Sequence, residues 1–97
     1  MPAYAVLYKW TEKGIANVKQ SPERIGRAKA LIETMGGRIV GVWVTMGEYD
    51  LVAIMEAPSD EAMAGFLLAQ TSGGSVTSTT LKAFSEEEFA RIVSKLP

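Results

Sequence analysis

The residues that could do chemistry in this chain are few, and the predicted fold collects them at one end of a β-sheet. Among 97 residues there is no cysteine and no histidine, which excludes disulfides, thiol nucleophiles, thiolate metal sites and the commonest general base. Lys9 and Asp50 are the only charges expected there in central strands, with Thr77 and Ser78 nearby. They could form a polar pocket, with Asp50 for an amine, Lys9 for a carboxylate and the hydroxyls for hydrogen bonds. The alternative is an ion pair between Lys9 and Asp50 that closes the sheet end.

Alternating apolar residues and capping signals predict the elements that position these side chains. Strands are expected over residues 4–10, 38–46, 49–57 and 76–84. Helices are expected to open at Ser21-Pro22, at residues 58–61 and at a capping box over residues 85–88. Right-handed crossovers and a central hairpin are both satisfied by an antiparallel sheet in spatial order 4-1-3-2, with helices on one face. The expected fold is one α+β domain over residues 1–97, ferredoxin-like βαββαβ with a C-terminal helix.

Both faces of the predicted sheet are apolar. One face is expected to carry Tyr4, Val6, Tyr8, Val40, Val42, Val44, Leu51 and Met55, and the other Leu7, Ile39, Trp43, Val52, Ile54 and Leu81. Burying each side chain of the second set is worth roughly 1.5–3 kcal/mol, so we expect a partner to cover them. The favoured cover is the same face of a second copy, which gives a homodimer or higher oligomer of the dimeric α/β-barrel type. The alternative is a monomer covered by its own C-terminal helix, with a buried stripe of Phe89, Ile92, Val93 and Leu96.

The composition narrows the range of partners. A net charge of -1 leaves no electrostatic footprint for nucleic acid, and no basic amphipathic run indicates a membrane surface. We expect no metal, because the acidic run at residues 86–88 is explained by helix capping, and we expect no cofactor. No signal peptide is expected at the N-terminus, and a cytoplasmic location is predicted.

A family resemblance adds to this interpretation. The stretch Thr45-Met46-Gly47-Glu48-Tyr49-Asp50, the first strand followed by Gly14-Ile15, and the passage from Thr80-Leu81 into Glu86-Glu87-Glu88-Phe89 resemble the small GYD domain family. That family has no agreed activity, so the resemblance implies a fold. The pattern from Gly47 to Leu81 is also similar to the effector-binding domain of Lrp/AsnC regulators. That likeness implies ligand contacts near Gly47, Tyr49, Asp50 and Thr79.

Three functions are compatible with these features. The favoured hypothesis is a stand-alone oligomeric domain that binds or senses a small molecule. The second is a cofactor-independent enzyme of the dimeric-barrel type that uses Asp50 or Tyr49, and the third is a structural assembly protein. The hairpin turn is also expected to need a positive φ at Gly47. The candidate ligand-binding residues are Lys9, Trp10, Gly47, Tyr49, Asp50, Thr77 and Thr79.

Overall fold

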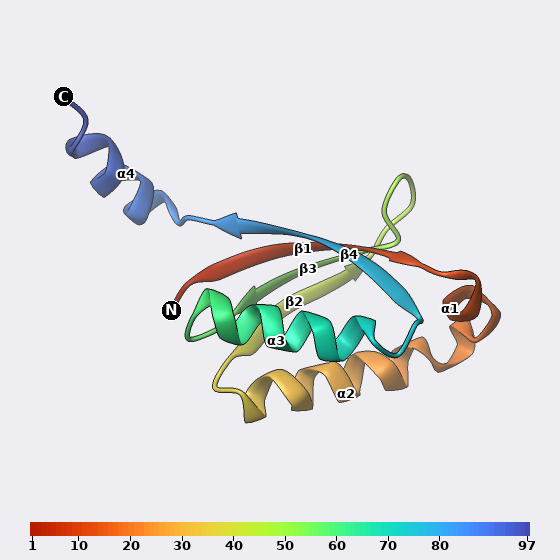
Figure 1. The fold of residues 1–97 in the computed structure, drawn as a ribbon. Coiled ribbons are helices and arrows are strands. Elements are labelled where there is room, and N and C mark those ends of the chain that lie inside the picture. The colour runs from red at the N-terminus through yellow and green to blue at the C-terminus, as the bar shows by residue number, and fades with distance from the viewer.

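A computed structural model describes all residues, 1–97, and contains one four-stranded antiparallel sheet with a ferredoxin-like arrangement of helices (Figure 1). The order along the chain is that predicted, with two short helical turns added in the first connection. No helix is both long and apolar enough to cross a membrane. The elements are β1 (Ala3–Trp10), α1 (Glu12–Ala16), the 3₁₀ turn η1 (Val18–Gln20), α2 (Ser21–Thr34), β2 (Arg38–Val44), β3 (Leu51–Glu56), α3 (Asp60–Thr71), β4 (Val76–Ala83) and α4 (Glu86–Ser94).

The sheet has the order β2-β3-β1-β4, which reads 4-1-3-2 from the opposite edge. β1 and β3 are therefore the central strands, and every pair of neighbours is antiparallel. The register places Tyr8 between Leu51 of β3 and Ser78 of β4. Because side chains alternate along a strand, this register decides which residues share a face.

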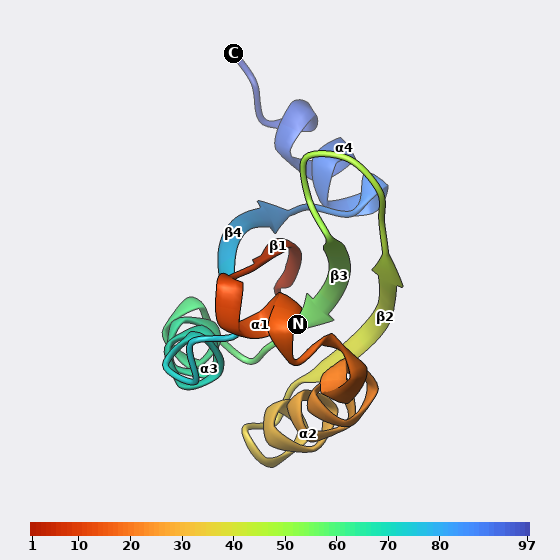
Figure 2. The same ribbon diagram turned by 90° about the vertical axis from the view of Figure 1, so that its right-hand side faces the viewer.

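α2 and α3 lie together on one face of the curved sheet, and the opposite face carries no helix (Figure 2). The core forms under these two helices. Phe66 and Met63 of α3 and Ile32 of α2 are each no more than 2% exposed. The strands contribute alternate residues to this core: Tyr4, Val6, Tyr8, Leu51, Ala53 and Met55.

A β-bulge in β2 corrects the predicted faces of that strand. The pairing with β3 shifts between Ile39 and Gly41, so Val40 is an extra residue in the ladder. Ile39 therefore packs against the core beside Val42, whereas Val40 is 51% exposed. The prediction that Ile39 faces away from the core was wrong because strict alternation cannot anticipate an inserted residue.

α4 corrects a second prediction. Its capping box is present as expected: the Glu88 N–H donates to Ser85 Oγ, and the Ser85 N–H donates to the Glu88 carboxylate. These hydrogen bonds hold the pKa of Glu88 below its usual value. The helix, however, leaves the end of β4 and projects away from the sheet (Figure 1). Its apolar stripe is exposed, with Phe89 at 61% and Ile92 at 45%, so it is neither buried in its own chain nor a cover for the sheet.

The start of α2 differs from the prediction in one detail. Ser21 was expected to be the N-cap, but it is the first helical residue and its side chain caps nothing. The 3₁₀ turn η1 runs directly into α2, so the cap position falls on Gln20. Ser21 is instead buried, and its hydroxyl accepts a hydrogen bond from Arg24 at 3.0 Å.

Candidate binding sites

Lys9 and Asp50, the two charged residues of the predicted site, do lie at the same end of the sheet. Tyr8 pairs with Leu51, so the next step along the two strands brings Lys9 opposite Asp50. The Asp50 backbone N–H donates to the Tyr8 carbonyl at 2.8 Å, and its carboxylate accepts from the Trp10 backbone N–H at 2.9 Å. The Asp50 side chain thus continues the ladder between β1 and β3 at the point where the backbone of β3 turns away.

The ion pair between Lys9 and Asp50, which was the alternative to a polar pocket, does not form. The structure has three ion pairs, Arg27–Glu23, Arg38–Glu56 and Lys82–Asp60, and Lys9 belongs to none of them. Its ammonium lies over the ring of Tyr49, 5.3 Å from the centroid, in cation–π geometry. The carboxylate of Asp50 instead accepts from the Trp10 backbone N–H. The predicted topology fixes where the two residues lie, but it does not decide between this hydrogen bond and an ion pair.

Gly47 has the backbone conformation that was predicted. Its φ is +126°, in the region that favours glycine, and a Cβ placed there would meet no atom within 4 Å. The constraint at this position is therefore conformational and not a matter of space. The loop is longer than the tight turn expected, since β2 ends at Val44 and β3 begins at Leu51. Thr45 closes it through two hydrogen bonds, from its backbone N–H to the Asp50 carbonyl and from its hydroxyl to the Tyr49 carbonyl.

The sheet separates the other candidate ligand-binding residues. Thr77 pairs with Lys9 and Thr79 pairs with Leu7, so both threonines share the open face of the sheet with Lys9. Trp10 belongs to the opposite face, where it packs against the core. The seven candidates therefore do not surround one cavity, and their role in ligand binding remains a prediction. No cluster of three or more acidic side chains is placed to hold a metal ion.

The open face of the sheet forms a large apolar surface. Leu81 is 52% exposed and Trp43 is 56% exposed, with its ring against the Cα position of Gly41. In the ladder, Leu7 pairs with Val52, and Ala5 pairs with both Ile54 and Leu81. We define the open face as Leu7, Trp43, Val52, Ile54 and Leu81.

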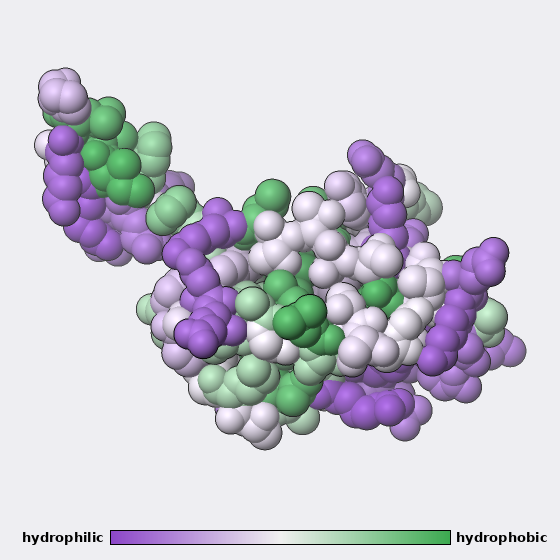
Figure 3. All heavy atoms as spheres, viewed as in Figure 1, coloured by the Kyte–Doolittle hydropathy of each residue, from purple (hydrophilic) through white to green (hydrophobic).

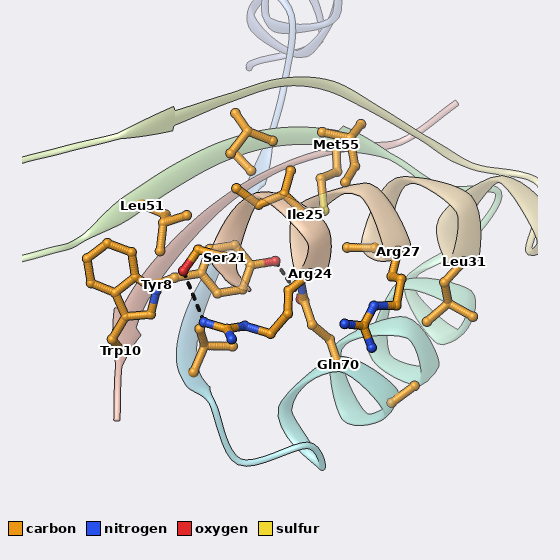
Figure 4. Close-up of a pocket in the computed structure, with 16 residues that line it drawn as sticks. Tyr8, Trp10, Ser21, Arg24, Ile25, Arg27, Leu31, Leu51, Met55 and Gln70 are labelled. Carbon is orange, nitrogen blue, oxygen red and sulfur yellow. Dashed lines mark hydrogen bonds between the residues drawn. The ribbon is translucent and has the colours of Figure 1, made fainter. Parts of the chain in front are cut away.

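The helix-covered side holds a cavity that the sequence did not indicate. It lies between α2, α3 and the sheet and has a volume of about 280 Å³ (Figure 4). Twelve of its sixteen lining residues are hydrophobic. Arg24 and Arg27 line it from α2, and Gln70 lines it from α3, where its side-chain oxygen accepts from the Tyr8 hydroxyl at 2.6 Å. Burial raises the pKa of Tyr8 above its usual value, which keeps this hydroxyl a neutral donor. The distance between two helices that pack on the same sheet leaves no local signal in the sequence. Sequence patterns therefore did not reveal the cavity.

The comparisons with known proteins agree with this fold. The GYD domain family matches residues 4–93 of the chain. The chain belongs to the GYD domain family. The resemblance seen in the sequence is thereby confirmed, and the match includes most of α4 as well as the sheet.

One curated protein is similar to the chain in sequence, and two solved structures are similar to it in fold. The chain is 34% identical over 84 residues to the glutamine synthetase and cystathionine beta-lyase binding protein of Thermus thermophilus, covering 86% of this chain and 88% of that protein. The crystal structure of FFRP-DM1 has a TM-score of 0.62 at 17% identity, covering 87% of this chain and 100% of that one. A hypothetical protein from Pyrococcus horikoshii has a TM-score of 0.51 at 16% identity, over 89% and 93% of the two chains. These structures share the fold, and the relative's name describes a binding protein.

Proposed function

We propose that this protein is a homo-oligomeric binding module in which two sheets pack face to face and α4 engages a partner protein. The observation that carries the proposal is the uncovered apolar surface. The open face and the stripe of α4 are both apolar, and neither is covered by any other part of the chain. Soluble proteins rarely leave surfaces of this kind in water unless they bind something.

The open face is suited to a second copy. Two antiparallel sheets pack at about 10 Å with their side chains interdigitated, and a two-fold axis allows one surface to cover itself. The charged side chains of this face, Lys9, Arg38 and Glu56, lie at or next to the ends of their strands, away from the middle of the face. At roughly 1.5–3 kcal/mol for each fully buried apolar side chain, this face supplies enough gross stabilisation for a dimer.

α4 is suited to a different protein. Its apolar residues Phe89, Ile92 and Val93 recur at helical spacing, and Figure 3 shows hydrophobic side chains along one side of the projecting helix and hydrophilic ones on the other. An amphipathic helix that carries its anchors at this spacing fits an apolar groove on another protein. The Thermus relative is named for binding two enzymes, which supports a protein partner of that kind here. A cytoplasmic location and the extent of the domain over residues 1–97 remain predictions.

The test combines sedimentation with an enzyme-binding assay. We expect the wild-type chain to sediment above monomer mass and to bind glutamine synthetase of its own organism in biolayer interferometry. Ile92→Glu should abolish enzyme binding with the mass unchanged, whereas Ser94→Glu, a matched neutral-to-acidic change at an exposed position of α4 outside the stripe, should preserve both. A monomer mass at all concentrations would overturn the oligomer. Loss of assembly in Ile92→Glu would instead assign α4 to the contact between copies.

Small-molecule binding at the sheet end is a second candidate. It is supported by Lys9, whose ammonium has no carboxylate partner, and by the loop that carries Gly47 and Tyr49 beside it. A thermal-shift screen of amino acids should find a ligand whose stabilisation is lost in Lys9→Met. Turnover of such a ligand that disappears in Asp50→Asn would favour the enzyme hypothesis. A screen without any stabilising compound would leave only the protein-binding role.

A further inference from the structure

The cavity between α2 and α3 is separate from the surfaces used above. It lies on the helix-covered side of the sheet, so neither the open face nor the stripe of α4 contributes to it. Its apolar wall comes from all four strands and from α2 and α3, and none of these residues belongs to the predicted site except Trp10. The wall consists of Tyr8, Trp10, Ile25, Ala28, Leu31, Ile39, Val42, Leu51, Ala53, Met55, Ala69 and Val76.

The size and lining of the cavity indicate an apolar guest. An apolar cavity of about 150 Å³ stays dry and binds benzene, and this one is about 280 Å³. It therefore has room for a ring with a short side chain or for a medium-length alkyl chain. Water would gain few hydrogen bonds against such a wall, because the polar groups are concentrated on a few residues: Ser21, Arg24, Arg27 and Gln70.

The charges on the cavity lining all have the same sign. Arg24 and Arg27 are the only ionisable residues among the lining besides Tyr8, and no aspartate or glutamate lines the cavity. Arg24 donates to the carbonyls of Asn17 at 3.1 Å and Gly14 at 3.5 Å and to Ser21 Oγ, but it has no carboxylate partner. Arg27 has only a long contact of 3.7 Å with Glu23, in which both side chains are 70% exposed. Such an exposed pair is worth little, so it would not compete strongly with a ligand.

The hydrogen-bonding groups around the opening favour an acceptor. Figure 4 shows Arg24 and Arg27 extending from α2 in front of the apolar side chains, with Gln70 opposite them on α3. The Gln70 oxygen is already used by the Tyr8 hydroxyl, so its amide N–H₂ group has no protein acceptor. Two guanidinium groups and one amide donor would all be satisfied by a carboxylate.

We propose that this cavity binds a small apolar carboxylate. The alkyl or aromatic part would fill the space between Ile25, Leu51 and Met55. Its carboxylate would take hydrogen bonds from Arg24, Arg27 and Gln70 at the opening between the helices. Binding there would tie α2 to α3 without using the open face or the stripe of α4, so this site is independent of the homo-oligomeric binding module proposed above.

The test uses octanoate and 1-octanol, which share a chain length and differ in the charged head. In titrations of the ¹⁵N-labelled protein, we expect saturable shifts confined to α2, α3 and the strands beneath them, with octanoate bound more tightly. Arg24→Gln and Arg27→Gln should each weaken octanoate by about tenfold, as expected for a charged hydrogen bond, and leave octanol within about twofold. Arg91→Gln on α4 is the matched control and should change neither ligand.

A cavity-filling variant separates this proposal from surface association. Ala28→Phe places a ring into the space and should abolish binding of both compounds, while Ile54→Glu on the open face should leave both affinities intact. The folding of each variant is checked by its amide spectrum without ligand, since Arg24 also supports the turn before α2. The proposal is overturned if octanoate gives no saturable shifts, if Ala28→Phe binds as the wild type does, or if octanol binds as tightly as octanoate.

Discussion

The two faces of the sheet have similar amino-acid types and opposite environments. Under α2 and α3, Val6 is fully buried and Met55 is 1% exposed. On the other face Trp43 and Leu81 remain more than half exposed, although they are just as apolar. The chain therefore covers only one of the two apolar faces that its strands create. The difference indicates that the second face depends on contacts between molecules, since sheets with one solvated face normally carry polar residues there.

The largest expected effect tests the covered face. Phe66→Ala removes a ring that is 1% exposed, and it should lower the free energy of unfolding by about 3–5 kcal/mol through the cavity that it leaves. Urea denaturation measures this directly. Leu68→Ala on the same helix, at a position 71% exposed, is the control and should change stability by less than about 0.5 kcal/mol. Equal effects of the two substitutions would contradict the assigned core.

The next substitution tests the open face. Ile54→Glu places a carboxylate at the centre of that face, where a second copy would bury it without a partner. Its expected effect is on assembly: a loss of about 3 kcal/mol or more in association free energy, with a monomer that still folds. Sedimentation velocity over a concentration series measures the loss. Leu68→Glu, an apolar-to-acidic change outside both faces, should keep the wild-type mass, and an Ile54→Glu protein that sediments like wild type would exclude the open face as the contact.

A smaller effect on stability is expected from a substitution in the loop between β2 and β3. Gly47→Val forces a β-branched residue into φ near +126° and should cost at least about 1 kcal/mol in unfolding free energy. Gly26 in α2 provides the contrast, because it has equal space for a Cβ but lies in a helix without a positive φ. Gly26→Ala should stabilise the helix by about 0.5–1 kcal/mol. An unchanged denaturation midpoint for Gly47→Val would show that the backbone strain is absent.

The smallest expected effect is a loss of stability in alkaline solution. Burial, with a hydrogen bond to Asp60, raises the pKa of Tyr4 from 10.0 to about 12. Because the folded state favours the neutral phenol, this contribution is complete below pH 10 and is lost as the pH rises through about 12. Denaturation midpoints between these pH values should therefore fall, and the fall should be smaller in Tyr4→Phe. A midpoint with the same pH dependence in both proteins would remove Tyr4 as the cause.

Local signals in the sequence predicted most of the fold. The Ser85–Glu88 capping box and the glycine at 47 have the expected geometry, because each depends on a few neighbouring residues. Topology also brought Lys9 and Asp50 to the same end of the sheet. The predictions that failed depend on contacts far apart in the chain or on one inserted residue. The bulge at Val40 turned the Ile39 side chain toward the core. The position of α4 depends on where β4 ends.

The candidate sites were harder to predict from the sequence than the fold was. Alternation placed Lys9 beside Asp50, but it could not show that the carboxylate prefers the Trp10 backbone N–H and the ammonium prefers the Tyr49 ring. The cavity depends on the gap between α2 and α3, which the small residues Ala28 and Ala69 leave unfilled. That pattern of small residues is also common in tightly packed helices, so it was not informative before the structure.

The most direct test of the central claim is the accessibility of Trp43 in solution. In a Trp10→Phe background, Trp43 is the only tryptophan, and acrylamide quenching of its emission reports whether its side chain meets solvent. In an isolated chain 56% of this residue is exposed. If a second copy covers the open face, quenching should be several-fold weaker than in the Ile54→Glu variant and should strengthen on dilution. Quenching that is equally strong in both proteins at every concentration would contradict the account.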